Sequence, residues 1–280
     1  MNSNKVIVNF CPTGMIPTKD LTPHVPVSPN EIIEQTHEAY EIGITIAHLH
    51  ARELSGEPTW KPEVYREIFE GVRKYCPHLV ICGSTSGRNF PEFEKRSAVI
   101  ELQPDMCSLT LSSLNFVHQA SLNDPSMIVR LVEKMNENGV VPELECFDLG
   151  MINYGKYLIH KGYVEGPFYW NLLFGNIAGF QASFSQIGAA LSEIPSNHFV
   201  GLAGLGGDQL SVTAAAISMG YNVRVGIEDN IWWDIKRTKL VTNSQLIERI
   251  HNLIELNGKE FFQPNEFGKL GFYNRKKNER

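Results

Sequence analysis

The chain has 280 residues, 42% of them hydrophobic and 20% charged, which is enough apolar material for a large buried core. A net charge of −6 gives no reason to expect a nucleic acid or an anionic membrane as a partner. The five cysteines are odd in number and form no C-x-x-C pair, so we expect neither a disulfide framework nor a zinc knuckle and favour a reduced, cytoplasmic setting. No signal-peptide pattern opens the chain and no run of about 18 apolar residues occurs, so we expect no membrane span.

Short apolar runs alternate with amphipathic stretches along the chain. The apolar runs are typical of parallel strands, which are buried on both faces. We expect strands at residues 6–12, 44–50, 79–85, 106–112, 140–147, 168–175, 199–205 and 222–228. Helical periodicity is clearest at residues 29–43, 62–75, 124–139 and 244–258. The first of these helices has a typical start, formed by Ser28, Pro29 and Glu31.

Eight strand–helix pairs predict a closed barrel. Spread over 280 residues they average about 35 residues each, the size of one βα unit. We therefore expect an α/β fold, a single-domain (β/α)8 TIM barrel over residues 1–258. Residues 259–280 would form a C-terminal extension that packs on the barrel or on a neighbouring subunit. An open doubly wound sheet is the alternative, but no G-x-G-x-x-G motif opens a first helix.

Two histidines, His48 and His50, end the second expected strand. Side chains at i and i+2 of a strand point the same way, so both imidazoles can converge on one metal ion. A pair of hydrogen-bonded or surface histidines would show the same spacing. Glu228 and Asp229 end the eighth strand and add carboxylates, which gives the two-His, one-carboxylate pattern of a catalytic metal site. Because Glu228 and Asp229 are adjacent, both face one site only if the strand ends there.

The carboxyl ends of the other strands carry further polar residues, and a TIM barrel builds its active site there. They are Ser84, Thr85, Ser86, Gly87 and Arg88 after the third strand, Ser108 and Thr110 on the fourth, Glu143 and Glu145 on the fifth, Gly206 and Gly207 after the seventh, and Arg224 on the eighth. Charges in buried strands are costly unless they are paired or bind metal. Glu143, Glu145 and Arg224 therefore either belong to an active site or form ion pairs inside the barrel. The GSTSGR and GLAGLGGD turns fit either anion binding through backbone N–H groups or plain turns.

These segments together resemble a known family. IAHLHARE, STSGR, SLTLSSLNF, VPELECFDLGM and RVGIEDN occur in the order and spacing of the β-keto acid cleavage enzymes, from the N-terminal strand to about residue 258. The resemblance implies a TIM barrel, a homotetramer and a divalent metal, most often Zn²⁺, held by His48, His50 and Glu228. It also implies a reaction in which a β-keto acid and acetyl-CoA give acetoacetate and a shortened acyl-CoA.

The resemblance assigns roles to the other polar residues as well. Asp229 would be the base, with Arg224 and Ser84 holding it in place, and Glu145 would orient a metal ligand or a water molecule. The expected substrate-binding positions are Ile16, Thr85, Ser86, Gly87, Ser108 and Thr110, and the expected CoA-binding positions are Gly206 and Gly207. A β-keto acid and acetyl-CoA are the expected small-molecule partners.

Two departures from the family pattern bear on the substrate. Ile16 stands where the aminohexanoate enzyme has a glutamate for its substrate's ammonium group. An apolar residue would leave that ammonium unpaired, so we expect a substrate that is neutral or apolar beyond C3. The turn after the seventh strand lacks an arginine often found in the family, and Lys19, Arg88 or Arg275 would have to replace its contact to CoA phosphate.

Three other functions fit a histidine pair in a barrel. A metal-dependent aldolase would cleave its substrate without CoA. A metallohydrolase of the amidohydrolase type needs further histidines after the fifth and sixth strands, and none occurs in residues 140–148 or 168–176. A barrel that has lost its activity and acts as a scaffold would bind metal without turnover.

Overall fold

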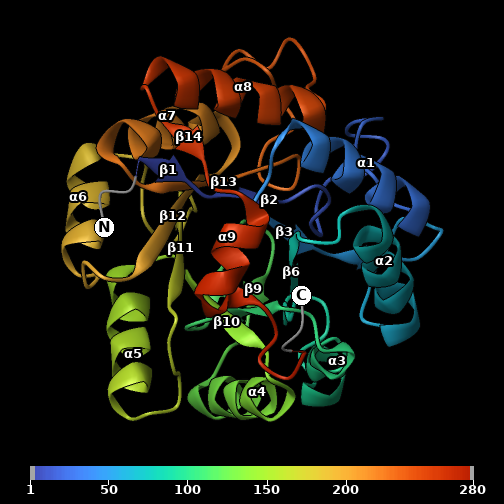
Figure 1. Ribbon diagram of the computed structural model, residues 1–280, viewed down its shortest axis with the longest axis vertical. Helices are drawn as coiled ribbons and strands as arrows, with labels where there is room; N and C mark the ends of the chain where they lie inside the picture. The colour runs from blue at the N-terminus through green and yellow to red at the C-terminus, as the bar shows by residue number, and fades with distance from the viewer. Residues whose placement is uncertain (1–3, 278–280) are drawn as a thin grey trace.

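The computed structural model describes residues 4–277 and contains a closed barrel of eight parallel strands (Figure 1). The strands are β2 (Val8–Phe10), β3 (Ile46–Leu49), β6 (Val80–Gly83), β7 (Met106–Thr110), β10 (Val141–Cys146), β11 (Tyr169–Phe174), β12 (Phe199–Gly204) and β13 (Asn222–Val225). The ring runs β2-β3-β6-β7-β10-β11-β12-β13 and back to β2, so each strand pairs with the next one along the chain. The predicted (β/α)8 barrel is confirmed, and every barrel strand lies within a predicted apolar run.

Helices surround the barrel on its outer side (Figure 1). They are α1 (Pro29–Ile42), α2 (Pro62–Tyr75), α3 (Phe93–Ser97), α4 (Pro125–Asn138), α5 (Leu149–His160), α6 (Phe184–Ser192), α7 (Gln209–Met219) and α8 (Asn243–Leu256). The predicted start of α1 is confirmed, because Ser28 and Glu31 form a capping box. The helices present apolar residues to the strands, and one cluster of buried side chains joins both layers.

The segment after α8 packs under the amino ends of the barrel strands, the end that faces the viewer in Figure 1. Its strand β14 (Glu260–Phe261) pairs in parallel with β1 (Lys5–Val6), and α9 (Pro264–Phe267) and the π-helix η3 (Gly268–Phe272) follow. Phe267 and Phe272 are buried and stack with ring centroids 4.0 Å apart. They share one cluster with residues from the barrel strands, among them Ile46, Val80 and Tyr169. This end of the barrel is therefore filled with apolar side chains.

Two small antiparallel hairpins stand beyond the carboxyl ends of the strands, and the sequence patterns did not predict them. The first joins β4 (Ala51–Arg52) to β5 (Pro58–Thr59), and the second joins β8 (Leu114–Asn115) to β9 (Ala120–Ser121). Short 3₁₀ turns also occur, η1 (Ile100–Leu102) and η2 (Gly206–Asp208). The β8–β9 hairpin contributes to the cavity described below.

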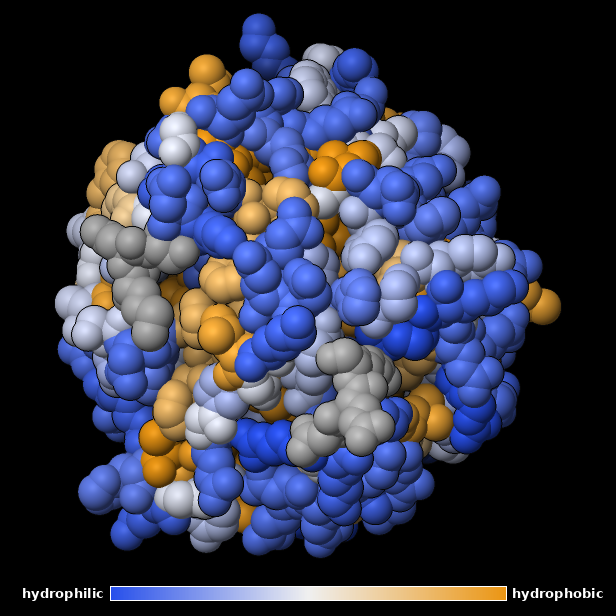
Figure 2. Space-filling model, in the orientation of Figure 1, coloured by the Kyte–Doolittle hydropathy of each residue, from blue (hydrophilic) through white to orange (hydrophobic). Residues whose placement is uncertain are grey.

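The surface is mostly hydrophilic on the face seen in Figure 2, with small apolar patches between charged residues. All five cysteines are buried and unpaired, and they pack as small apolar residues. Among the described helices, none combines the length and the apolar character needed to cross a bilayer.

Candidate active site

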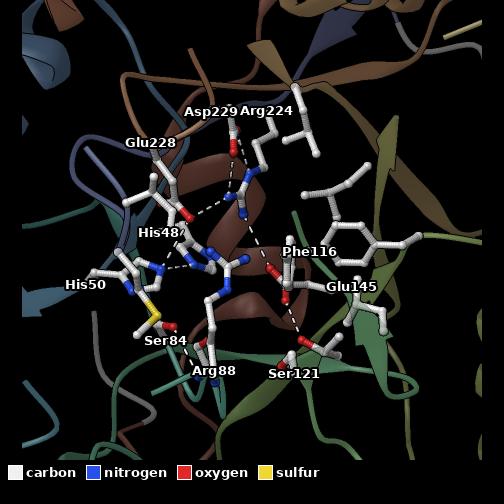
Figure 3. Close-up of a pocket in the computed structure, with 18 residues that line it drawn as sticks. His48, His50, Ser84, Arg88, Phe116, Ser121, Glu145, Arg224, Glu228 and Asp229 are labelled. Carbon is white, nitrogen blue, oxygen red and sulfur yellow. Dashed lines mark hydrogen bonds and ion pairs between the residues drawn. The ribbon is translucent and has the colours of Figure 1, made fainter. Parts of the chain in front are cut away.

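A cavity of about 220 Å³ opens at the carboxyl ends of the barrel strands (Figure 3). Its polar lining consists of His48, His50, Ser84, Ser86, Arg88, Thr110, Ser121, Glu145, Arg224, Glu228 and Asp229. Its apolar lining consists of Met15, Ile16, Leu114, Phe116, Phe147, Leu173 and Leu205. The cavity thus lies where a TIM barrel places its active site, and its size suits a small organic molecule.

The two histidines and Glu228 converge on one side of this cavity (Figure 3). The Nε2 atoms of His48 and His50 are 3.3 Å apart, and Nε2 of His50 is 3.3 Å from Oε1 of Glu228. Their ligand atoms all lie within 4.8 Å of one another. Oε2 of Glu228 is buried and has no hydrogen-bond partner among the described residues. Two imidazole nitrogens and a carboxylate oxygen in this arrangement fit a divalent metal with open positions.

The chain turns sharply before Glu228, and this turn lets both adjacent acids face the cavity. The strand expected to reach residue 228 ends at Val225. At Gly226 the backbone passes so close to Cys11 that a Cβ atom would lie 1.9 Å from the Cys11 carbonyl oxygen, so only glycine fits. The Gly226 carbonyl then accepts hydrogen bonds from the backbone N–H groups of Asp229 and Asn230. Glu228 and Asp229 belong to a turn, and the alternation of a strand does not apply to them.

A fully buried carboxylate, Glu143, holds the ring of His48. Oε2 of Glu143 lies 2.6 Å from Nδ1 of His48, and Oε1 accepts hydrogen bonds from Asn9 and Asn171 at 2.6 and 3.2 Å. Burial lowers the pKa of His48, yet the negative charge of Glu143 raises it to about 9. Burial likewise raises the pKa of Glu143, but His48 brings it below its ordinary value. With Nδ1 occupied, His48 presents Nε2 to the cavity.

Arg224 joins three carboxylates at the centre of the site (Figure 3). It binds Asp229 through two nitrogens, with Nε to Oδ2 at 2.9 Å and Nη2 to Oδ1 at 3.1 Å. It also donates to Glu228 at 2.8 Å and to Glu145 at 3.4 Å. Burial raises the pKa of Asp229 above its ordinary value, and the charge of Glu228 adds to this effect while Arg224 opposes it. Asp229 is thus a fixed carboxylate with an increased affinity for a proton.

Glu145, which we expected to orient a metal ligand or a water molecule, has its hydrogen bonds to residues other than the two histidines. Its Oε2 accepts a hydrogen bond from Thr110 at 2.9 Å, and its other partner is Arg224. The carboxylate that orients His48 is Glu143, two residues earlier on β10. The alternating acids in PELEC signalled both residues, but the sequence could not tell which one faced the histidines.

The polar residues after β6 and on β7 divide into two groups. Ser84, Ser86 and Thr110 line the cavity. Thr85 and Ser108, which we expected to bind substrate, instead bind each other: the N–H of Thr85 donates to Oγ of Ser108, and the Thr85 hydroxyl donates to the Ser108 carbonyl. Neither is part of the cavity lining, and their contacts join the loop after β6 to β7.

A buried arginine that the sequence analysis did not single out, Arg96, fixes the same loop. Its guanidinium donates to the Thr85 carbonyl at 2.9 Å, to the Leu122 carbonyl at 3.1 Å and to Asn123 Oδ1 at 2.7 Å. Gly87 lies against this group, and a Cβ atom there would be 2.6 Å from Nη1 of Arg96. Gly87 therefore packs against Arg96 and is not among the residues that line the cavity, and its expected contact with substrate stays a prediction.

The expected CoA-binding glycines also lie outside the cavity lining. Gly206 donates its backbone N–H to the Asp229 carbonyl at 2.7 Å, so this group supports the turn that carries Asp229. Of the cations considered for CoA phosphate, Lys19 pairs with Glu31 at 2.7 Å. Arg275 donates to main-chain carbonyls beside the barrel's other end. Only the third of these cations, Arg88, lines the cavity.

Known proteins share sequence with this chain over most of its length. The model of the beta-keto acid cleavage enzyme family matches residues 5–270. This chain belongs to that family. It is 32% identical to the 3-keto-5-aminohexanoate cleavage enzyme of Acetoanaerobium sticklandii, over 94% of this chain and 96% of that protein. It is 30% identical to the 3-oxoadipate:acetyl-CoA acetyltransferase of Cupriavidus necator, over 90% of this chain and 89% of that protein.

A solved structure supports the fold independently. The apo structure of ObcA superposes with a TM-score of 0.75 at 16% identity and covers 90% of this chain and 66% of that chain. The family resemblance seen in the sequence and the expectation of an enzyme are therefore confirmed. Ile16, where we expect an apolar residue in place of the aminohexanoate enzyme's glutamate, lines the cavity, and 58% of the residue is exposed.

Proposed function

We propose that this enzyme converts a β-keto acid and acetyl-CoA into acetoacetate and the acyl-CoA of the remaining chain. The observation that carries this proposal is the placement of the His48, His50 and Glu228 ligand atoms in one cavity with the Arg224-bound carboxylate of Asp229. A relative supports acetyl-CoA as the co-substrate, since the C. necator protein is named for acetyl-CoA and a β-keto acid.

His48, His50 and Glu228 would hold the metal, and we propose zinc as the ion because imidazole and carboxylate ligands in an open site suit it. When bound, the metal supplies a Lewis acid that polarises the oxygens of a β-keto acid. Glu143 keeps Nε2 of His48 directed at that position. A cytoplasmic homotetramer is the proposed state of the enzyme.

Asp229 is the proposed base. The proton at C2 of a β-keto acid is acidic because the resulting negative charge is shared with the ketone. Arg224 holds both oxygens of Asp229, and the raised pKa of Asp229 favours proton uptake. Ser84 and Thr110 offer hydroxyl groups in the same cavity for substrate oxygens.

The chemistry balances without a further reactant. The C2 carbanion attacks the thioester carbon of acetyl-CoA and expels the CoA thiolate. The thiolate then adds to the original ketone, and the bond between that carbon and C2 breaks. The CH₂COO⁻ unit has moved to the acetyl group, so the products are acetoacetate and a new acyl-CoA. The proton held by Asp229 returns to C2 of acetoacetate.

Acetoacetate is the product common to all substrates of this reaction, so the reverse reaction gives the sharpest test. The purified, zinc-loaded enzyme is incubated with acetoacetate and a panel of acyl-CoAs, and acetyl-CoA is measured. We expect acetyl-CoA from at least one acyl-CoA and none with His48→Ala. A metal-loaded enzyme that forms none across a broad panel would contradict the proposal and favour a CoA-independent aldolase, a hydrolase or an inactive scaffold.

A further inference from the structure

Arg88 is a cation in the active-site cavity that has no anionic partner among residues 4–277. Its side chain lines the cavity, and Figure 3 shows it reaching inward from the side that carries Ser84 and Ser121. Within residues 4–277 no carboxylate lies within ion-pair distance of Arg88. Its Nε atom is buried and has no hydrogen-bond partner in the same part of the chain. A buried donor left unpaired is costly, so a ligand that accepts hydrogen bonds here recovers that cost.

The guanidinium is held in one orientation. Its central carbon lies 3.4 Å from the centre of the Phe116 ring, a close stacking contact between a cation and an aromatic face. Phe116 belongs to the hairpin turn between β8 and β9 and packs edge-on against Phe147, with ring centroids 5.8 Å apart. Arg96 fixes the loop that carries Arg88 through buried hydrogen bonds. The fork of Arg88 is therefore preorganised before a ligand arrives.

The charge around Arg88 comes from the catalytic centre. Burial lowers the pKa of Arg88, whereas the charges of Glu228, Glu145 and Asp229 raise it, so these carboxylates share its surroundings. Arg224 is already bound to the same three carboxylates. Arg88 is the lining cation that remains available to an incoming anion.

We propose that Arg88 binds a carboxylate group of the β-keto acid through its planar guanidinium fork. Guanidinium and carboxylate match as two parallel hydrogen bonds, and this pairing is stronger and more directional than neutral contacts. The bound group is either the carboxylate at C1, shared by all β-keto acids, or a second carboxylate at the far end of a dicarboxylic one. In the second case the substrate is charged beyond C3, unlike the neutral or apolar substrate that the sequence led us to expect. With Ile16 instead of an acid at the other lining position, the cavity disfavours an ammonium group in two ways, by repulsion and by lack of a partner.

This inference rests on the proposed function, and a binding measurement separates the two. Isothermal titration calorimetry is carried out on the zinc-loaded enzyme without acetyl-CoA, with 3-oxohexanoate and with 3-oxoadipate as probes. We expect Arg88→Met to weaken the binding of at least one probe roughly 10- to 100-fold, the range of a lost charged hydrogen bond. Arg88→Lys should recover part of the loss because it keeps the charge but not the fork. Arg130→Met is the matched control, since Arg130 also stacks on a phenylalanine, Phe93, but lies outside the cavity.

The two probes distinguish the sources of the carboxylate. If Arg88→Met binds both acids more weakly, Arg88 contacts the C1 carboxylate. If it binds only 3-oxoadipate more weakly, Arg88 contacts the second carboxylate. Unchanged binding of both acids by Arg88→Met would overturn the proposal, as would an effect limited to the KM for acetyl-CoA. A wild-type enzyme that binds these acids through Arg88 but forms no acetyl-CoA in the reverse assay would refute the proposed reaction and leave the Arg88 site intact.

Discussion

The Nδ1 atom of His48 lies 2.6 Å from the Oε2 atom of Glu143, and both side chains are almost completely inaccessible to solvent. Asn9, Asn171 and Cys82 surround the same carboxylate with hydrogen bonds. A carboxylate in the middle of a barrel is stable only because these donors replace water. Because Glu143 accepts the proton of Nδ1, a metal that displaces the Nε2 proton of His48 would meet a lone pair directed at the cavity.

The contact to His48 predicts a metal-affinity role for Glu143. Glu143→Gln keeps the shape of the side chain but offers an amide group in place of one carboxylate oxygen. We expect zinc affinity to fall roughly 10- to 100-fold, measured by competition with a chromogenic chelator. Glu133→Gln, at an exposed position on α4, serves as the control. Equal zinc affinity in both variants and the native enzyme would show that Glu143 has only a structural role.

Asp229 should be required for turnover but not for metal binding. Asp229→Asn removes the proposed base while it retains a group of the same size beside Arg224. We expect kcat to fall roughly 10²- to 10⁴-fold, the usual contribution of general base catalysis. Zinc content measured by elemental analysis should stay at the native level. Full activity in this variant would remove Asp229 from the mechanism.

Ile16 should exclude substrates that carry an ammonium group. Ile16→Glu places a carboxylate at the cavity lining, where it can pair with such a group. We expect the ratio of kcat/KM for an amino β-keto acid to that for its neutral analogue to rise roughly tenfold or more. Ile16→Gln, which is polar but uncharged, is the control. An unchanged ratio in Ile16→Glu would contradict the role of this position in selectivity.

The buried cluster at the amino ends of the strands, which contains Phe267 and Phe272 and is called the apolar plug below, should contribute strongly to stability. Phe272 is fully buried against Phe267, so Phe272→Ala leaves a cavity in the plug. We expect the free energy of unfolding, measured with urea, to fall by about 3–5 kcal/mol. Leu270→Ala, two residues earlier and 50% exposed, should change it by less than about 1 kcal/mol. Similar losses in both variants would mean that the plug packs loosely.

The start of α1 predicts a pH-dependent contribution to stability. Burial raises the pKa of Glu31, but hydrogen bonds from Lys19 and from the backbone N–H groups of Val27 and Ser28 lower it from 4.5 to about 2. A lowered pKa stabilises the folded state above pH 4.5, and the effect is lost as the pH falls towards about 2.

Glu31→Gln tests this contribution. The side chain is 38% exposed, so after solvent screening we expect a loss of only about 0.5–1 kcal/mol at pH 7. The difference from the native protein should shrink between pH 4.5 and pH 2 in urea titrations. Glu34→Gln, on the exposed side of the same helix, serves as the control. If the free energies of unfolding of Glu31→Gln and the native protein differed by the same amount at every pH, the charge of the Glu31 carboxylate would not contribute to stability.

The sequence itself determined the barrel and much of its catalytic end. Parallel strands buried on both faces are mostly apolar, so the eight runs were visible without any tertiary information. Backbone geometry also places residues i and i+2 of a strand on one side, which brought His48 and His50 together. The rule that barrel active sites form at the carboxyl ends of the strands then selected Glu228, Asp229, Arg224 and Ser84, and all of them line or enter one cavity.

Only the tertiary structure decided which polar group contacts which. Glu143 and Glu145 lie two residues apart on β10, and closure of the barrel brings Glu143 to His48 on β3 and Glu145 to Thr110 on β7 and Arg224 on β13. The end of β13 at Val225 depends on the close approach of Gly226 to Cys11, more than 200 positions earlier in the chain.

Arg88 shows the same limit of sequence reasoning. Its phenylalanine partner belongs to a hairpin that has only two residues in each strand, too short to produce a periodic pattern. Periodicity reports the side of an element on which a residue lies. Contacts between elements depend on how the barrel closes, and local sequence does not encode that.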